Sequence, residues 1–396
     1  MLGWESAHRR VLVAYGTRPE AIKLAPVVRS LRGSERLRPV VVVSGQHREM
    51  LDQVNELFGI VPDADLNVFA PGQSLTAITT RVLTGYTEFL AAHPVDAVVV
   101  QGDTTTAFAA ALAGFYARVP VVHVEAGLRT GDRYAPFPEE VNRRLTAQTA
   151  SLHLAPTSLA RANLLAEGVA AGDVVVTGNT VIDALLHAVA ARRPSGDPVV
   201  DAACHSGRPI VLVTAHRRES WGSAMAAIGR AVAGVAAARP DVLLVLPAHR
   251  NPVVREQLLP EVEGHDNVRV IEPLPYGPFC HLLSRSALVL TDSGGIQEEA
   301  PGLGVPVLVL RDTTERPEAV RAGGARLVGT DTGRIERAAL DLLRDERLHR
   351  AMARAGSPFG DGRAARRSRA AIECLLGVGD REPEFETPGA VATRQP

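Results

Sequence analysis

The chain has 396 residues, of which 46% are hydrophobic and 22% are charged, and its formal net charge is −1. This length predicts two domains, and the near-zero charge gives no reason to expect nucleic acid or an anionic membrane as a partner. Three widely spaced cysteines predict neither a disulfide framework nor a zinc site, and they fit a reducing cytoplasm. We expect no signal peptide and no membrane span, because no apolar run has the required length or position.

Short apolar runs alternate with helical stretches along the chain. The first series of predicted strands is 10–15, 40–44, 97–101, 119–124, 151–155 and 173–177, and the second is 209–214, 242–247, 268–271, 287–291, 305–310 and 325–328. Predicted helices include 21–32, 105–117, 158–167, 223–238, 276–285 and 334–344. Continuously apolar strands that alternate with helices are typical of parallel sheets covered on both faces. The sequence therefore predicts an α/β protein with two doubly wound, Rossmann-like domains.

The boundary between these domains is predicted within 181–207, where the stretch 191–198 is rich in turn-forming residues. This places an N-terminal domain at 9–180 and a C-terminal domain at 181–363. Residues 1–8 and 380–396 are predicted to be loose tails. Ligands of open parallel sheets bind outside the carboxyl ends of the strands, so a cleft between the two domains is expected to hold the site.

Lys23 is the single lysine among 43 basic residues, and it follows the first predicted strand in the segment 16–23. Arg serves wherever a generic positive charge is enough, so a retained ammonium indicates a compact charge on a phosphate, although chance survival is the alternative. Arg18 lies at the start of the same helix. A strand, a Gly turn and a helix start with two cations together predict an anion site.

A second anion signal follows the strand 287–291, where Ser293, Gly294 and Gly295 precede a helix start. Such a turn exposes backbone N–H groups that a diphosphate oxygen can accept. Glu299 lies about one turn into this helix, from where a carboxylate can bind ribose hydroxyls. The alternative is an ordinary helix cap at Ser293. Neither a G-x-G-x-x-G nor a P-loop motif is present.

Ionisable residues follow several predicted strand ends, and these are Asp103, Glu125, Glu139 and His216. Carboxylates gathered at one cleft raise each other's pKa, as acid–base chemistry near neutrality requires. Each also has a structural alternative: a helix cap for Asp103, an ion pair with Arg129 for Glu125, a solvated loop charge for Glu139 and a structural imidazole for His216. No His and carboxylate set has metal-ligand spacing, and the triplet 63–65 does not follow a buried strand, so no metal is expected.

In combination these segments resemble the non-hydrolysing bacterial UDP-N-acetylglucosamine 2-epimerases. The matching stretches are 16–23, 46–53, 102–106, 123–131, 177–183, 216–220, 291–301, 311–318 and 358–362. The resemblance covers about residues 9–376. It implies two Rossmann-like domains of the GT-B type, a C-terminal helix at 364–376 that crosses back to the first domain, and a homodimer. It also implies reversible conversion of UDP-GlcNAc to UDP-ManNAc without a cofactor.

Site residues are carried over position by position. The resemblance places UDP-binding positions at Arg18, Lys23, Ser293, Gly294, Gly295, Glu299 and Arg316, with uracil contacts at Leu274 and Phe279. Its catalytic positions are Asp103, Glu125, Glu139 and His216. The positions of a second, activating UDP-GlcNAc are Gln46, Glu49, Gln73, Arg217, Glu219 and His249, with departures from the family pattern at Gly72 and Arg250.

The chemistry of the sugar fits these residues. The C2 proton is not next to a carbonyl, so it becomes acidic only as UDP leaves and positive charge develops at C1. The family mechanism is elimination of UDP to a 2-acetamidoglucal, followed by re-addition. Cations at the diphosphate would stabilise the charge that grows there. Which carboxylate removes the proton and which returns it stays open.

Two other enzyme activities fit the same fold: a GT-B glycosyltransferase and a hydrolysing epimerase that releases ManNAc. A nucleotide-sugar sensor without catalytic activity is the non-enzyme alternative. Incubation with UDP-GlcNAc alone discriminates them, because an epimerase equilibrates two UDP-sugars, a hydrolase releases UDP, and a transferase or sensor returns the donor unchanged.

Overall fold

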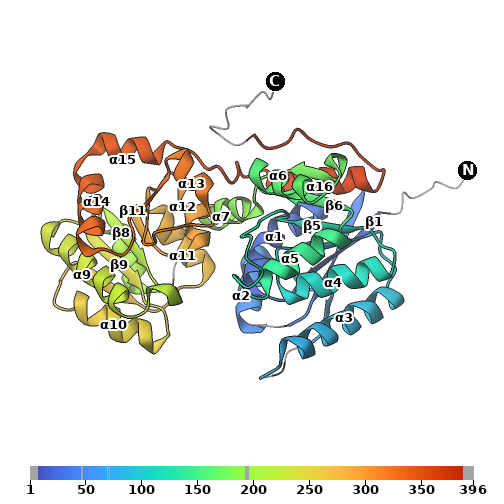
Figure 1. The fold of residues 1–396 in the computed structure, drawn as a ribbon, viewed down its shortest axis with the longest axis horizontal. Helices are drawn as coiled ribbons and strands as arrows, with labels where there is room; N and C mark the ends of the chain where they lie inside the picture. Colours follow the sequence, from blue (N-terminus) through green and yellow to red (C-terminus); the bar gives the residue numbers. More distant parts are fainter. Residues whose placement is uncertain (1–7, 46–47, 69, 71, 192–195, 387–396) are drawn as a thin grey trace, which may run out of the picture. The chain divides into compact units, whose positions relative to one another are not determined.

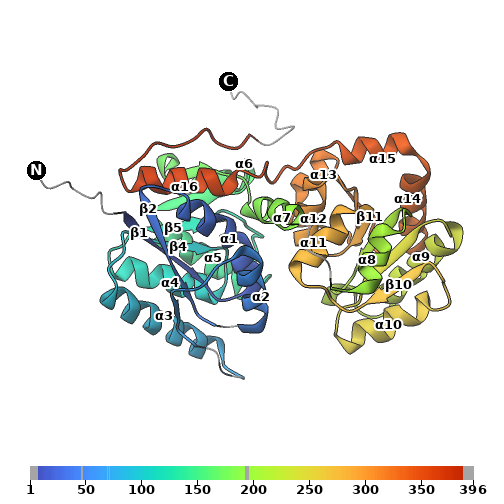
Figure 2. The same ribbon diagram turned by 180° about the vertical axis from the view of Figure 1, so that it is seen from behind.

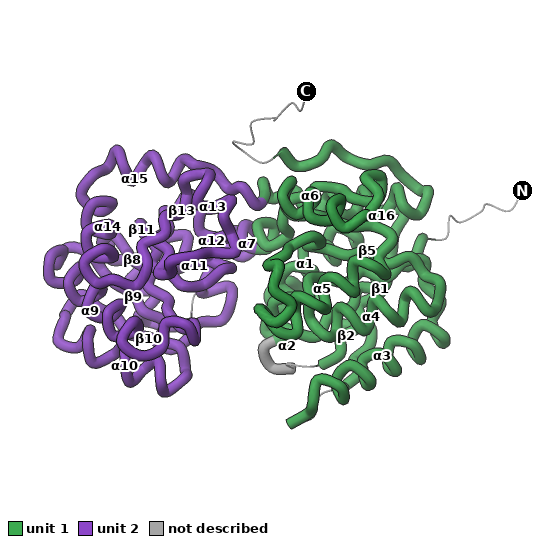
Figure 3. The backbone as a smooth tube through the Cα atoms, in the orientation of Figure 1, with its two compact units in different colours: residues 1–184, 360–387 green, residues 185–359, 388–396 purple. Residues whose placement is uncertain are grey.

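The structure is a computed structural model that describes residues 8–45, 48–68, 70, 72–191 and 196–386, with side chains of residues 48–50 excepted. It divides into two compact units (Figure 3). Unit 1 contains residues 1–184 and 360–387, and unit 2 contains residues 185–359 and 388–396. Part of the predicted connector, 192–195, lies outside the described residues.

Unit 1 contains a parallel sheet in the order β3-β2-β1-β4-β5-β6-β7. Figure 1 labels β1, β5 and β6 of this sheet. Its strands are β1 (Arg9–Tyr15), β2 (Leu37–Val43), β3 (Ala64–Asp65), β4 (Ala97–Gln101), β5 (Val121–Val124), β6 (Leu152–Ala155) and β7 (Val174–Val176). Its helices are α1 (Arg18–Arg32), α2 (Arg48–Phe58), α3 (Leu75–Ala92), α4 (Thr105–Tyr116), α5 (Glu139–Thr149), α6 (Ser158–Ala166) and α16 (Ala364–Leu375), with a short 3₁₀ helix at Ala171–Asp173. Helix α7 (Thr180–Ala190) begins in unit 1 and ends in unit 2.

Unit 2 repeats this arrangement with the order β10-β9-β8-β11-β12-β13, again parallel. Figure 2 labels β10 and β11 of this sheet. Its strands are β8 (Ile210–Thr214), β9 (Leu243–Pro247), β10 (Val268–Ile271), β11 (Ser286–Thr291), β12 (Val307–Val309) and β13 (Ala325–Leu327). Its helices are α8 (Pro198–His205), α9 (Ser223–Ala238), α10 (Pro252–Val262), α11 (Tyr276–Ser284), α12 (Gly294–Gly302), α13 (Pro317–Ala322), α14 (Thr332–Arg344) and α15 (Glu346–Ala353), with a 3₁₀ helix at Arg218–Ser220.

The predicted fold class is confirmed, because both sheets are parallel and doubly wound. Strands such as β4 and β8 are buried along their whole length, which explains why they are apolar without alternation. In each sheet the strand order reverses between two central strands, β1 and β4 in unit 1 and β8 and β11 in unit 2. Loops that follow these strands on opposite sides of the reversal leave a crevice, which is where such sheets bind ligands.

One local expectation needs correction. Helix α1 begins at Arg18 rather than at residue 21, because Pro19 is tolerated in a first turn and Glu20 accepts hydrogen bonds from the preceding N–H groups. The triplet 63–65 includes the short edge strand β3. There Asp63 Oδ2 accepts from Val41 N at 2.7 Å and Asp65 Oδ1 from Asn67 N at 2.8 Å, so both carboxylates serve local structure.

The described part of the predicted C-terminal tail, 380–386, is packed rather than loose. Phe385 is buried, its N–H donates to Val176 O at 2.8 Å, and the Arg367 guanidinium lies 5.7 Å from the centre of its ring. Glu384 also pairs with Arg161 at 2.7 Å. An aromatic anchor outweighs the polar composition that suggested disorder. Residues 387–396 and 1–7 lie outside the described residues.

Candidate functional site

Glu125 follows β5 in unit 1, and its carboxylate is surrounded by N–H donors. Lys23 Nζ lies 2.6 and 2.7 Å from its two oxygens, and Asn179 Nδ2 donates to Oε1 at 2.9 Å. Gln101 Nε2, at the end of β4, donates to Oε2. The side chain of Glu125 is 5% exposed. A carboxylate held by a cation and several donors is stabilised in its ionised form.

The backbone of Glu125 is also unusual, because its φ of 61° lies in the left-handed region. That conformation is rare for a residue with a side chain, and it costs about 1–3 kcal/mol where surrounding contacts impose it. Strained backbone of this kind is concentrated at functional sites. The predicted alternative, a pair between Glu125 and Arg129, is wrong, because Arg129 donates to both oxygens of Glu167 at 2.8 and 2.6 Å.

Lys23 and Arg18 both lie on α1, yet the structure places them differently. Lys23 is 19% exposed against Glu125, whereas Arg18 is exposed in the first turn. The N–H groups of Gly16 and Thr17 already donate to Glu20 Oε2, at 3.1 and 2.7 Å. Burial raises the pKa of Glu20, and the hydrogen bonds oppose that rise. The start of α1 therefore provides two cations, while part of its backbone is satisfied internally.

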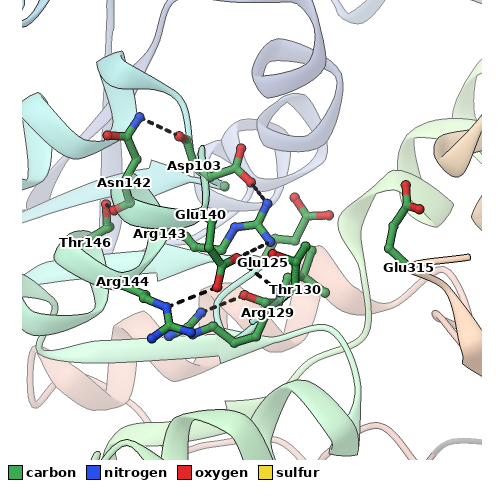
Figure 4. A network of polar contacts seen from close by, with 12 residues as sticks. Asp103, Glu125, Arg129, Thr130, Glu140, Asn142, Arg143, Arg144, Thr146 and Glu315 are labelled. Atoms are coloured by element: carbon green, nitrogen blue, oxygen red, sulfur yellow. Dashed lines mark hydrogen bonds and ion pairs between the residues drawn. The ribbon is translucent and has the colours of Figure 1, made fainter. Parts of the chain in front are cut away.

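Asp103 follows β4 and belongs to a network of charges that also includes α5 (Figure 4). Arg143 pairs with Asp103, and its Nη1 lies 3.4 Å from Oε2 of the buried Glu140. Asn142 Nδ2 donates to the carbonyl of Asp103 at 3.0 Å. The predicted Glu139 begins α5, one residue before Glu140, and is partly exposed. Because β4 and β5 are neighbours, unit 1 brings Asp103 and Glu125 to the same edge of its sheet.

His216 follows β8 in unit 2 and rests on the buried Asp292. Asp292 Oδ2 accepts from the backbone N–H groups of His216 and Arg217 at 2.7 and 2.8 Å, and Oδ1 lies 3.4 Å from His216 Nδ1. The ring of His216 stacks on that of His249, with centroids 5.6 Å apart. Burial lowers the pKa of His216, while the charge of Asp292 opposes this.

Arg217 is the first residue of a chain of ion pairs that continues through Glu315 and Arg311 to Glu219. Its Nη2 lies 3.0 Å from Glu315 Oε1, Arg311 Nη1 lies 2.6 Å from Glu315 Oε2, and Arg311 Nε lies 2.5 Å from Glu219 Oε1. Burial alone would raise the pKa of Glu315, but the hydrogen bond from Arg311 and the nearby guanidinium charges lower it to about 2. The structure thus brings together Arg217, Glu219 and His249 beside His216.

The glycine turn after β11 is confirmed as a helix start, but not as an ordinary cap. Ser293 occupies the N-cap of α12, and within the described part of the chain its hydroxyl forms no capping hydrogen bond. Its N–H donates to Thr291 Oγ1 at 2.9 Å. A Cβ at Gly294 would lie 2.9 Å from Glu315 Oε1, so a side chain there would require the Glu315 carboxylate to move. Gly295 is exposed with open space around it.

The remaining nucleotide positions surround α11 and α12. Glu299 is 7% exposed and accepts a hydrogen bond from the Tyr276 hydroxyl at 3.1 Å. Glu298, which precedes Glu299 in the sequence, forms an ion pair with Arg316. Burial, followed by the charge of Glu299, raises the pKa of Tyr276. Leu274 and Phe279 are partly exposed on either side of the start of α11.

The other predicted activator positions lie in unit 1. Gln73 Nε2 donates to Val68 O at 2.9 Å, just before α3. Gln46 lies outside the described residues, and the side chain of Glu49 is not among those described. Among the residues that the structure describes, no group of three or more His, Cys, Asp and Glu side chains could hold a metal ion.

Several contact residues were missing from the sequence prediction. Gln101 and Asn179 both bind Glu125, Arg143 binds Asp103, and Asp292 supports His216. Asp292 could have been found from its place at the end of β11, beside the glycine turn. Asn179 lies in the matching stretch 177–183, but local sequence does not indicate its contact with Glu125, a residue 54 positions away.

Both switch points carry the predicted residues. Lys23 and Asp103 follow β1 and β4, and His216 and Ser293 follow β8 and β11. Two doubly wound units with polar groups after the strands at which the order reverses define a two-domain α/β protein of the GT-B class.

Comparison with known proteins identifies the family within this class. The family model described as UDP-N-acetylglucosamine 2-epimerase matches residues 29–373. A UDP-N-acetylglucosamine 2-epimerase from Escherichia coli K12 is 52% identical over 372 residues, which cover 90% of this chain and 96% of that protein. The chain belongs to the UDP-N-acetylglucosamine 2-epimerase family and is an enzyme of the isomerase class, as its sequence predicted.

Solved structures agree with this assignment. A protein from Listeria monocytogenes is 47% identical, with a TM-score of 0.91 and coverage of 96% of this chain and 100% of that one. The UDP-GlcNAc 2-epimerase from Neisseria meningitidis, solved with UDP-GlcNAc bound, is 45% identical, with a TM-score of 0.82 and coverage of 93% and 100%. The described residues contain no helix that is long and apolar enough to cross a membrane.

Proposed function

We propose that the protein interconverts UDP-GlcNAc and UDP-ManNAc without net hydrolysis. The observation that carries this proposal is the Glu125 carboxylate, which Lys23, Gln101 and Asn179 hold beside Asp103 at the carboxyl ends of β4 and β5. A buried carboxylate with fixed contacts suits proton removal from carbon. The bound UDP-GlcNAc of the Neisseria meningitidis relative supports the choice of substrate.

In the proposed reaction, the C1–O bond breaks and its electron pair leaves with UDP. A carboxylate takes the C2 proton, and a double bond forms between C1 and C2, which gives 2-acetamidoglucal. A proton then reaches C2 on the opposite face, and the UDP oxygen re-forms its bond to C1. Asp103, Glu125 and Glu139 are the proposed proton-transfer groups, in an order that stays open. Exclusion of water would protect the glycal from capture.

The departing UDP needs positive charge and N–H donors. We assign the diphosphate to Arg18, Lys23, Arg316 and the turn at Ser293, Gly294 and Gly295, with His216 as a further stabilising group. Glu299 is assigned to the ribose, and Leu274 and Phe279 to the uracil. Since Lys23 contacts Glu125 and Arg316 contacts Glu298, the proposal requires both cations to share or exchange these partners when the nucleotide binds.

Three finer features belong to the same proposal. The chain of ion pairs from Arg217 to Glu219 and the stacked His249 support binding of a second UDP-GlcNAc as an activator, together with Gln46, Glu49 and Gln73. The resemblance supports a homodimer, which sedimentation analysis tests. Three free thiols, Cys204, Cys280 and Cys374, support a cytoplasmic location.

Proton NMR of UDP-GlcNAc incubated with the protein in deuterium oxide tests the activity. We expect loss of the C2 proton signal and appearance of a second UDP-sugar. Free ManNAc and UDP would show a hydrolysing enzyme instead, and an unchanged substrate would contradict the proposal. A sigmoidal dependence of rate on UDP-GlcNAc would support the activator site.

A further inference from the structure

Residues 177–183 of unit 1 contact both the candidate site and the segments in which the chain passes between the units. The chain leaves unit 1 after Ala184 and returns to it at Gly360. The outgoing segment contains Asn179 and Asp183, and the returning segment leads into α16. These two segments are about 180 residues apart in sequence, and several hydrogen bonds join them.

Asn179 connects the outgoing segment to Glu125. Its Nδ2 donates to Glu125 Oε1 at 2.9 Å, and its Oδ1 accepts from Val181 N at 3.1 Å, in the first turn of α7. The residue is 2% exposed. An amide is suited to this position because it donates with one atom and accepts with the other, which a carboxylate does not.

Asp183 connects the outgoing segment to the returning one. Its Oδ1 accepts from Ala365 N at 2.9 Å and its Oδ2 from Ala364 N at 3.2 Å, so it caps the first turn of α16. Burial raises the pKa of Asp183 to about 6, while these two N–H groups oppose the rise. The cap therefore joins the outgoing segment to the first turn of α16 in the returning segment.

The returning chain also passes close to Asn179 itself. A Cβ at Gly360 would lie 3.3 Å from Asn179 O and 3.3 Å from Ile182 Cγ1, which is tighter than an ordinary van der Waals contact, so the two segments lie close together there. Arg367 of α16 donates to Thr177 O at 3.2 Å and pairs with Asp361 at 2.7 and 2.8 Å. The segment that carries Asn179 is thus bound to the returning chain on both sides of Asn179, at Thr177 and at Asp183.

We propose that Asn179 is a positioning residue for Glu125, and that Asp183 fixes the segment carrying Asn179 against the returning chain. The orientation of Glu125 then depends on contact between the two segments through which the chain passes from one unit to the other. The proposal rests on the proposed function, because it assumes that Glu125 takes part in proton transfer.

The charges that face Glu125 decide which measurement is informative. Among the described residues they include Lys23 of α1, which contacts Glu125, and His123 of β5, which interacts with it electrostatically. The pair of Asp103 with Arg143 follows the neighbouring strand β4. His123 is neutral near pH 7, because burial lowers its pKa to about 3. The amide of Asn179 adds no charge. A carboxylate in its place would oppose ionisation of Glu125, so the acidic limb of the rate profile should move to higher pH.

Two substitutions of Asn179 test the proposal. Both Asn179→Asp and Asn179→Ser retain an acceptor for Val181 N. Asn179→Asp has no donor for Glu125, and the hydroxyl of Asn179→Ser ends one bond short of the Nδ2 atom that makes this contact. We expect kcat for UDP-GlcNAc to fall about tenfold or more with KM within about threefold, as is typical when a hydrogen bond to a charged group is lost. Asn179→Asp should also move the acidic limb of kcat/KM upward by about one pH unit. Solvent deuterium incorporation at C2 should slow in parallel.

Asp183→Asn tests the second half of the proposal, and Asp331→Asn is its matched control. Asp331 caps α14 in unit 2 through Arg334 N at 2.8 Å, so the control also removes a carboxylate cap. We expect kcat to fall about threefold or more in Asp183→Asn and to stay at the wild-type value in Asp331→Asn.

Each outcome decides between the proposals. If wild-type protein leaves UDP-GlcNAc unchanged, the proposed function fails. If wild-type protein is active and a folded Asn179→Asp or Asn179→Ser variant keeps its kcat and its acidic limb, the positioning role is wrong. If Asp183→Asn behaves like Asp331→Asn, the link to the returning chain is wrong. Circular dichroism establishes folding, and Asn179→Ser serves if Asn179→Asp does not fold.

Discussion

The two units share a topology but organise different chemistry at their switch points. In unit 1, carboxylates such as Glu125 and Asp103 project from strand ends and are held by cations and amides. In unit 2, the turn after β11 is short and glycine-rich, and the buried Asp292 supports the His216 segment through backbone N–H groups. The doubly wound sheet thus determines where a site lies, and the residues of the loops determine whether that site is suited to proton transfer or to anion binding.

The largest expected effect comes from neutralising the carboxylate at the centre of unit 1. Glu125→Gln retains the shape of the side chain but loses its charge, so kcat should fall by about a thousandfold or more. The rate of C2 deuterium incorporation measures this directly. Glu261→Gln, which alters an exposed pair with Arg230 in unit 2, is the control and should leave kcat unchanged. A wild-type kcat in Glu125→Gln would show that Glu125 does not take part in proton transfer.

A smaller loss is expected from the buried carboxylate of unit 2. Asp292→Asn replaces an oxygen by an NH₂ group that faces the N–H donors of His216 and Arg217 or the His216 ring, so the histidine should lose its orientation. We expect kcat to fall about a hundredfold, because a displacement of about 1 Å of a group that must be precisely positioned can cost this much. Steady-state kinetics measure the effect, with thermal unfolding to follow the fold. An unchanged kcat would show that His216 does not depend on this contact.

Glu299→Gln should separate binding from chemistry. Glu299 is assigned to the nucleotide and contacts the Tyr276 hydroxyl. Removing its charge should therefore weaken binding of the substrate in the ground state and in the transition state by the same amount. We expect KM to rise about tenfold while kcat changes less than about twofold. Calorimetric binding of UDP should weaken by the same factor. A fall in kcat at constant KM would instead place Glu299 in the chemical step.

The smallest effect concerns stability and pH in unit 1. Burial lowers the pKa of His123 to about 3, so between pH 6.5 and 3 the unfolded chain binds a proton that the native state does not. Its contribution to the unfolding free energy therefore decreases as pH falls, by about 1.4 kcal/mol per pH unit. His123→Gln should remove that slope between pH 6 and 5, as measured by urea unfolding.

The control for this measurement is the exposed His205 of unit 2, where His205→Gln should leave the slope as it is. Asp183 acts in the opposite direction, because its raised pKa of about 6 lets the native state bind the extra proton between pH 6 and 4. An unchanged slope in His123→Gln would show that the native state accommodates the charged ring.

Much of the site followed from local sequence. Residues such as Lys23, Asp103, Glu125 and His216 come directly after apolar strands, and parallel sheets gather such positions at one edge. The contacts that these residues make could not be predicted from local sequence. Lys23 was expected at a phosphate and lies on Glu125, which is 102 positions away.

The sequence by itself determined the alternation of buried strands and helices, the family and the positions that carry polar groups, because each of these depends on short segments or on ordered motifs. The tertiary structure alone decided which groups hold Glu125, how Asp183 joins the outgoing chain to α16, and that residues 380–386 pack through Phe385. These contacts join residues 54 to 209 positions apart, and local pattern carries no information on such pairs until the chain is folded.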